Sequence, residues 1–332
     1  MGKKRQQHYV FQGYLQAWAD NKNQIICLRE RQTTFKTHIK NVAQERDFYK
    51  IERWNADEVQ FYKIWISKYP PRIQALLLEH LALYQIPYEN ESWLDRFSKI
   101  IGSSTDLNGE ILDALKEMEC LIDEQKINTV EDFHNDIETQ AMSWLNALRN
   151  KEKSFYMQED KADFINYLCI QYFRTRKIKD VLINTIEEAK KHPKWSTLNI
   201  CMENIHAEHL IHMFTWEFQY GCAYHLLAHD THMTLLINSS RQNFLTSDQP
   251  VINLEANYSV AEDTKELVFY YPISPRVAIT VNDRNIEDEM LVEEARVHDY
   301  NNKLITASYR NLYSLNEDDF NYYFYGNSLE TS

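Results

Sequence analysis

The chain has 332 residues, of which 44% are hydrophobic, and this is enough for a sizeable core in one large domain or two smaller ones. Its formal net charge of -13 at pH 7 opposes general attraction to phosphate backbones, so contact with nucleic acid would require a local basic patch. Only 6 glycines are present, and neither GxGxxG nor GxxxxGK[ST] occurs, which excludes Rossmann-type and P-loop nucleotide sites.

The N-terminal part of the chain begins with MGKKRQQHYV, a basic start without the apolar segment of a signal peptide. The stretch YLQAWAD then predicts a short helix. QIICLRE and TTFKTHI, on either side of a short polar connection, predict a β-hairpin. The connection lacks Gly and Asn-Gly, so the turn type stays open.

The middle of the chain, from about residue 57 to 229, has helical periodicity. PPRIQALLLEHLALYQ begins with proline and continues with strong helix formers, and EDFHNDIETQAMSWLNALRNK has apolar residues three and four apart. KADFINYLCIQYFRTRKIKDVLINTIEEAKKH predicts a helix whose first half is buried. No apolar run approaches the roughly eighteen residues of a membrane span, and the five cysteines lie singly, as expected for reduced thiols. We therefore predict a cytoplasmic protein with no membrane association.

The strand signal returns after residue 229. HMTLLIN, NFLTSD, ELVFYYPIS and VAITVN are rich in β-branched and aromatic residues, and EDEMLVEEARVHDYNNKLITASYRNLYS predicts a final long helix. The order of elements predicts an α+β fold in which a mixed sheet, built from strands at both chain ends, is packed against a long helical middle. We expect a single domain over 1–332, with an N-terminal hairpin at 1–50, a helical region at 55–230 and C-terminal strands and helix at 231–325. A separate helical subdomain inserted near residues 55–160 is the alternative.

Two N-terminal stretches, HYVFQGYLQAWAD and KNVAQERDFYKIE, are followed in order by DIETQAMSWLNAL, QYFRTRK, FLTSDQPV, YYPISP and VHDYNNKLITASYRNLY. In motif and spacing they resemble the bacterial family called domain of unknown function 4238. The resemblance covers nearly the whole chain and is weakest between about residues 60 and 130. Phe11 stands where the family motif has proline. Family members occur in bacteria and mobile elements, so the resemblance implies a bacterial protein with a role in defence or toxicity.

The stretch CIQYFRTR places a charge close to the apolar side of a predicted buried helix. Gln171 and Arg174 are three residues apart, and both are candidates for substrate binding. A buried guanidinium requires an anionic or carbonyl partner. Two hypotheses remain: a structural pair with Glu138 or Asp248, or binding of an anion such as phosphate.

Three further residues are candidates for proton transfer or metal binding. His8 opens the N-terminal motif with a side chain suited to acid–base chemistry, and the alternative is a hydrogen-bonded histidine that ties the N-terminus to the sheet. In FLTSDQPV, Asp248 leaves a strand at a turn stopped by Pro250, so either Ser247 and Asp248 form a turn or Asp248 acts as a base beside Ser247 in a binding site. From the resemblance blocks we expect His8, Glu138, Arg174 and Asp248 to converge.

Six of the twelve histidines lie in a cluster between His206 and His232. His225 and His229 are four residues apart, which on a helix aims both rings to one side. No HExxH motif accompanies them and the ligand spacing is incomplete, so a polar helix face or a satisfied core is favoured over a metal site.

Two classes of function follow. In the first, the protein is a nuclease-like or nucleotide-directed hydrolase with His8, Glu138 and Asp248 as catalytic residues, Gln171, Arg174 and Ser247 as substrate-binding residues, and a divalent metal as an optional cofactor. In the second, it is a sensor or partner-binding module with a buried Arg–carboxylate network. The partners would be nucleic acid or a nucleotide in the first class and a protein in the second.

Overall fold

The computed structural model describes residues 2–102, 109–193, 195, 200–257, 266–284 and 287–324. The chain forms two compact units, each made of three segments: unit 1 comprises Met1–Gln7, Glu45–Asn135 and Asp180–Glu217, and unit 2 comprises His8–Gln44, Asp136–Lys179 and Phe218–Ser332. Strands toward both chain ends and a long helical middle confirm the predicted α+β class. The single domain and the inserted helical subdomain both stay predictions.

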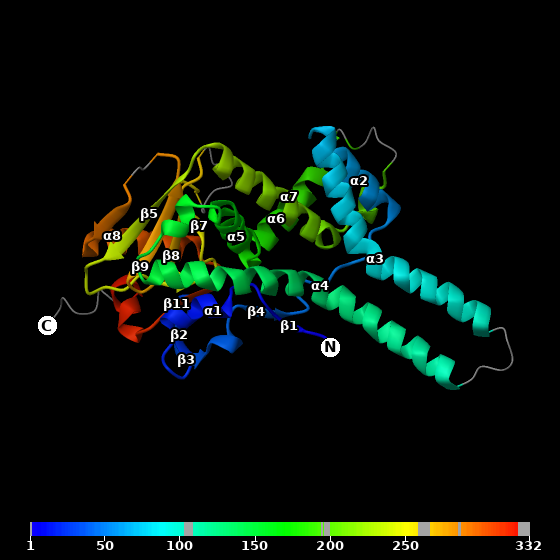
Figure 1. Cartoon of the computed structure of the whole chain (residues 1–332), viewed down its shortest axis with the longest axis horizontal. Helices are drawn as coiled ribbons and strands as arrows, with labels where there is room; N and C mark the ends of the chain where they lie inside the picture. Colours follow the sequence, from blue (N-terminus) through cyan, green and yellow to red (C-terminus); the bar gives the residue numbers. More distant parts are fainter. Residues whose placement is uncertain are drawn as a thin grey trace. The chain divides into compact units, whose positions relative to one another are not determined.

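Unit 1 is built mainly from helices. It contains α2 (Ala56–Ile66), α3 (Pro71–Gly102), the first part of α4 (Gly109–Arg149), most of α6 (Arg176–Lys190) and the first half of α7 (Ala207–Ala228). Within this unit, α3 and the first part of α4 run side by side in opposite directions (Figure 1). The core is aromatic, since Trp54 and Phe214 both pack against Tyr62. The described helices of the chain include none that is long and apolar enough to cross a membrane.

Unit 2 contains a five-stranded and a four-stranded sheet. The five-stranded sheet has the order β10-β5-β9-β8-β7, with β5 (His232–Asn238), β7 (Ile252–Asn253), β8 (Phe269–Ser274), β9 (Val277–Asn282) and β10 (Glu289–Val292). The four-stranded sheet has the order β3-β2-β11-β6, with β2 (Gln24–Arg29), β3 (Thr33–His38), β6 (Thr246–Ser247) and β11 (Asn311–Ser314). The second sheet therefore joins strands from both ends of the chain, as predicted. A short pair, β1 (Gln6–His8) and β4 (Gln44–Arg46), is separate.

The β2–β3 hairpin is confirmed, and its turn type is now defined. Glu30 and Arg31 have φ of 50° and 58°, and the N–H of Gln32 donates to the carbonyl of Arg29 at 3.0 Å. Two consecutive residues with positive φ are typical of a type I′ turn, which matches the twist of the flanking strands. Non-glycine residues occupy both positions, so the sequence carried no glycine signal for this turn.

Helix α8 (Glu294–Ala307) joins the two sheets of unit 2 into one core. Its residues Val297, Tyr300 and Leu304 are buried in a cluster with strand residues from both sheets. Tyr300 stacks on Tyr270 of β8, with ring centroids 4.7 Å apart and planes inclined by 4°. Figure 1 shows α8 beside the strands of this unit.

The predicted final helix from residue 287 to 314 is wrong at both ends. Glu289–Val292 forms β10, parallel to β5, and Asn311–Ser314 forms β11 between β2 and β6. Only residues 294–307 are helical. Pairing in a sheet outweighs helix propensity in these two segments, which is the usual way in which tertiary contacts override local preference.

At the N-terminus, α1 (Gln12–Leu15) and a 3-10 turn at Gln16–Trp18 confirm the predicted short helix. Phe11 caps α1 with φ of -60°. Proline imposes the same φ, so the backbone at Phe11 has a conformation that proline would also adopt.

Candidate functional site

Arg174 belongs to unit 2 and lies in the short connection between α5 (Lys161–Phe173) and α6. Helix α5 ends at this residue, and α6 begins two residues later. The guanidinium donates to the carboxylate of Glu138 on α4 and to the backbone carbonyl of His8. The Arg174 side chain is only 1% exposed and that of Glu138 only 9%, so this is a buried ion pair. Burial raises the pKa of Glu138, and the attraction of Arg174 opposes that rise.

The His8 ring is held by two neighbours. Its Nε2 lies 3.1 Å from the carbonyl of Lys40, and its Nδ1 lies 3.3 Å from the side-chain amide of Gln12. A carbonyl only accepts, so Nε2 carries the proton and Nδ1 accepts from the amide N–H. Burial lowers the pKa of His8 below its ordinary value, and the positive charge of Arg174 lowers it further. The ring is therefore neutral at pH 7.

Asp248 follows β6 directly and is completely buried. Its carboxylate accepts hydrogen bonds from the backbone N–H groups of Tyr309, Arg310 and Asn311, each at 2.8 Å, and from the Asn311 side chain at 3.2 Å. These bonds oppose the rise in the pKa of Asp248 that burial causes. The carboxylate thus fixes the segment that connects α8 to β11.

Ser247 and Gln249 connect this segment to the end of α5. The Ser247 hydroxyl donates to the Gln249 carbonyl at 2.8 Å and accepts from the Gln249 N–H at 3.0 Å, which is a local turn. The side chain of Gln249 accepts from the hydroxyl of Thr175 and donates to the carbonyl of Tyr172 at 3.1 Å. The turn in FLTSDQPV that ends β6 therefore contacts Tyr172 and Thr175, at and just beyond the end of α5.

Gln171 is the one candidate whose buried side chain lacks hydrogen-bond partners among the described residues. Its side chain is 1% exposed, and within the described part of the chain neither its amide oxygen nor its amide nitrogen has a hydrogen-bond partner. A buried amide without partners costs free energy, so Gln171 is unfavourable for the fold at this position.

The structure brings together Arg174, Glu138 and the main chain of His8. Ser247 and Asp248 belong to a second cluster, which Thr175 and Gln249 connect to the first. The side chains of His8 and Asp248 are directed at Lys40 and at residues 309–311. The catalytic and substrate-binding roles of these residues stay predictions.

The histidine cluster is divided among several contacts. The ring centroids of His225, on α7, and His229, just beyond its end, lie 4.2 Å apart, as their spacing predicts. In unit 1, His209 lies 2.9 Å from the Glu58 carboxylate and His212 lies 3.1 Å from the Lys50 carbonyl. Among the residues that the structure describes, no three or more His, Cys, Asp or Glu side chains come together as metal ligands would.

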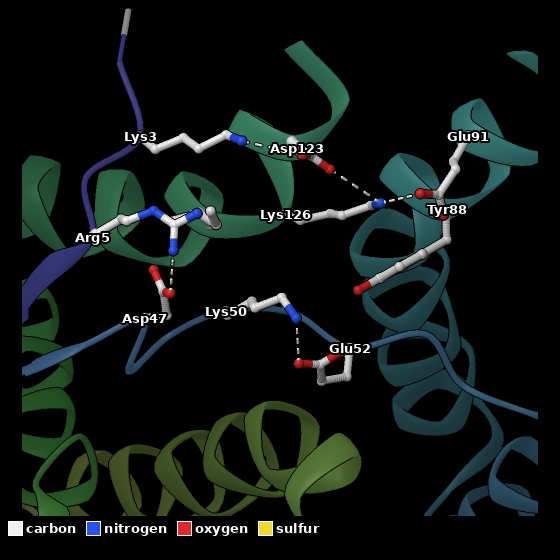
Figure 2. A pocket seen from close by; sticks show the side chains of 10 residues that line it. Lys3, Arg5, Asp47, Lys50, Glu52, Tyr88, Glu91, Asp123 and Lys126 are labelled. Atoms are coloured by element: carbon white, nitrogen blue, oxygen red, sulfur yellow. Dashed lines mark hydrogen bonds and ion pairs between the residues drawn. The ribbon is translucent and has the colours of Figure 1, made fainter. Parts of the chain in front are cut away.

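Unit 1 contains a charged pocket of about 470 Å³ that sequence reasoning missed. Figure 2 shows the side chains that converge on it from the N-terminal segment, the segment around residue 50, α3 and α4. The lining consists of four cations, four carboxylates, one tyrosine and one aliphatic residue: Lys3, Arg5, Lys50, Lys126, Asp47, Glu52, Glu91, Asp123, Tyr88 and Ile127.

The N-terminal segment is fixed against α4, and this positions two of the four cations. The Lys4 N–H donates to Asn128 at 2.8 Å, and the Gln7 side chain donates to the Ile127 carbonyl at 2.7 Å. Alternate residues of an extended segment share a side, so Lys3 and Arg5 both face the pocket. The basic run GKKR was the only signal for this arrangement, and its partners are distant in sequence: Asp123 is 120 residues from Lys3 and Asp47 is 42 residues from Arg5.

Each cation of the pocket is paired with a carboxylate. The distances are 3.1 Å for Lys3–Asp123, 2.9 Å for Arg5–Asp47, 2.8 Å for Lys50–Glu52 and 2.5 Å for Lys126–Glu91. Lys126 also lies 4.8 Å from the centre of the Tyr88 ring, which is a cation–π contact. Lys126 is buried, whereas Arg5 and Lys50 are each 40% exposed. Arg5 and Lys50 are thus the most accessible of the four cations, and Lys3 is 28% exposed.

Comparison with known proteins identifies one family. A family model described as "Protein of unknown function (DUF4238)" matches residues 6–318, which is nearly the whole chain. No curated protein and no solved structure matches the chain.

Proposed function

This chain belongs to the DUF4238 family, and we propose that it is a non-catalytic sensor that binds a small phosphate-bearing ligand, such as a nucleotide, in the charged pocket of unit 1. The observation that carries the proposal is the convergence of four cationic side chains on one pocket whose volume lies in the usual range for small-molecule sites.

The hydrogen bonds of Asp248 and Arg174 within the fold support a sensor over an enzyme. The Asp248 carboxylate holds three consecutive backbone N–H groups, and Arg174 is divided between Glu138 and a carbonyl. A general base must reach a substrate proton, and an anion-binding arginine must reach the anion. Both side chains are instead buried and bonded to the fold, which favours the hypothesis of an Arg–carboxylate network.

The ion pairs of the pocket are weak enough for a phosphate to compete with the carboxylates already present. Its four cations balance its four carboxylates, so the lining is neutral within a chain whose net charge is -13. Partly exposed ion pairs such as Lys50–Glu52 stabilise a protein by only about 0–1 kcal/mol. A phosphate carries up to two charges and binds arginine with two hydrogen bonds, so it can displace these carboxylates toward solvent.

Titration calorimetry with pyrophosphate, ADP and ATP tests the proposal, with citrate as an anion that lacks phosphorus. We expect binding of at least one phosphate compound and roughly tenfold or greater weakening by Lys50→Gln, because a hydrogen bond to a charged group contributes about 1.5–3 kcal/mol. Lys22→Gln removes an exposed lysine outside the pocket and should bind as the wild type does.

Absence of binding, equal binding by Lys50→Gln and the wild type, or equal affinity for citrate would each overturn the phosphate sensor. Analysis of the titrated nucleotide distinguishes the enzyme: hydrolysis that Asp248→Asn abolishes in a folded protein would establish the hydrolase instead. A cellular role in defence or toxicity, which the family resemblance implies, stays a prediction.

A further inference from the structure

A second apolar stripe runs along α3, apart from the face that packs within unit 1. The packed face contains Leu77, Leu81, Tyr84, Tyr88 and Leu94, all less than 10% exposed. The second stripe is exposed to solvent at five large side chains: Leu83 60%, Ile86 41%, Trp93 53%, Phe97 37% and Ile100 71%. Side chains of this size in one row on a helix mark an interaction surface.

The spacing of the stripe is that of a coiled-coil seam. From Leu83 to Ile100 the members are alternately three and four residues apart, provided that Asn90 is included. Leu83, Asn90 and Phe97 then occupy the a positions of a heptad, and Ile86, Trp93 and Ile100 occupy the d positions. A single asparagine at an a position is a known device for specifying register and the number of helices.

Helix α4 has exposed apolar side chains of its own. Ile111, Met118 and Leu121 are exposed by 40%, 44% and 51%, and their spacing of seven and three residues repeats the a and d pattern. Each of the two helices therefore has an exposed seam. Figure 1 shows them as an antiparallel hairpin. Two such hairpins can bury their seams against each other as a four-helix bundle.

We propose that the α3–α4 hairpin is a homodimer interface in which α3 of one copy packs antiparallel to α3 of a second copy. A two-fold axis between Glu91 and Ser92 pairs every a position with a d position. Leu83 then faces Ile100 of the second copy, and Ile86 faces Phe97. In the central layer Asn90 faces Trp93, whose indole N–H can donate to the asparagine oxygen.

Charge complementarity fixes this arrangement. Glu89 and Arg96 occupy successive g positions beside the seam, and g positions of antiparallel helices face each other. The same axis brings Glu89 of each copy beside Arg96 of the other. In a parallel pair Glu89 would instead face the e position of Leu94, which is buried within its own unit. The charges therefore favour the antiparallel dimer over the parallel one.

The length of the seam is sufficient for an interface. From residue 83 to residue 100 the helix rises about 26 Å, and six side chains of each α3 line this length. The seams of α4 add to the buried area. A symmetric contact that uses the same patch on both copies closes at two chains.

Sedimentation velocity over a range of protein concentrations tests the dimer, with the full chain at physiological salt. We expect a concentration-dependent dimer that Leu83→Glu converts to a monomer, because the new charge lies in the seam. Leu291→Glu is the matched control, since Leu291 is 72% exposed on β10, and it should leave the dimer intact. A monomeric wild type, or a dimer that Leu83→Glu does not weaken, would overturn the proposal.

The charge pair gives a second test that does not depend on one variant. Glu89→Arg and Arg96→Glu each place like charges across the axis, and each variant alone should dimerise at least several-fold more weakly than the wild type. Mixing the two variants restores both opposite-charge pairs only in the antiparallel register. A mixture that dimerises no better than the separate variants contradicts that register. Circular dichroism confirms that each variant is folded.

Discussion

Asp248 binds Asn311 twice, accepting its backbone N–H at 2.8 Å and its side-chain N–H at 3.2 Å. Asn311 begins β11, the strand that pairs with β2 on one side and β6 on the other. Asp248 directly follows β6, so one carboxylate fixes the place where strands from the two chain ends meet. This explains why a buried acid follows a strand in FLTSDQPV.

Asp248→Asn should therefore destabilise the fold. The amide keeps the size of the carboxylate but has a single acceptor oxygen and sets an N–H2 group against the N–H groups of residues 309–311. We expect the free energy of unfolding to fall by about 3 kcal/mol, measured by urea denaturation. Asp283→Asn, at an exposed position, is the control and should change it by less than about 0.5 kcal/mol. A loss no larger than that of the control would show that the carboxylate is not needed for the fold.

Removal of one partner of the buried ion pair should be costly, and removal of both should cost less than the two single changes together. Glu138→Gln leaves the Arg174 guanidinium buried without its counter-charge, so we expect a loss of about 3–5 kcal/mol in the free energy of unfolding. Arg174→Met together with Glu138→Gln removes both charges, and Arg174→Met alone is the second single variant. The measurement is a double-mutant cycle by denaturant unfolding.

The exposed pair Lys116–Asp113, whose side chains are 74% and 80% exposed, provides the comparison for that cycle. Asp113→Asn should cost less than about 0.5 kcal/mol. Strict additivity of the Arg174 and Glu138 changes would contradict a direct pairing of the two groups.

Local patterns in the sequence predicted much of the fold around these residues. The hairpin of β2 and β3 and the burial of α5 follow from alternation and apolar runs. One of the two carboxylates proposed for Arg174, Glu138, is its partner, because a buried guanidinium requires an acid and few acids occur in the apolar blocks.

What sequence could not predict depends on contacts between distant segments. Glu289–Val292 lies in a charged stretch that favours a helix, and only the neighbouring β5 makes it a strand. The pocket of unit 1 also depends on contacts between distant segments. Lys3 pairs with Asp123, 120 residues along the chain, and the periodicity of a sequence does not predict such a contact. The apolar residues of the α3 seam are visible in the sequence. Helix α3 also has a packed apolar face, however, and a helix that is apolar on two faces resembles a buried helix.

The stability of the protein should fall in mild acid because of His8. Burial lowers the pKa of this ring below 6.5 in the folded state, and unfolding restores the ordinary value. Below about pH 6.5 the unfolded chain therefore binds more protons than the folded one, so the free energy of unfolding decreases as the pH falls toward the folded pKa. Well above that pH, near pH 8, the ring is neutral in both states, and His8 contributes no pH dependence.

His8→Gln should reduce the slope of stability against pH between about pH 6.5 and 5, because glutamine does not titrate and its amide can still donate to the Lys40 carbonyl. Urea denaturation of the wild type and the variant at several pH values measures both slopes. Near pH 8 the two proteins should show the same slope, which serves as the internal control since the ring is uncharged there. Parallel curves across the whole range would mean that the His8 ring has the same proton affinity in the folded and unfolded chains, and that the contacts to Lys40 and Gln12 do not hold it neutral.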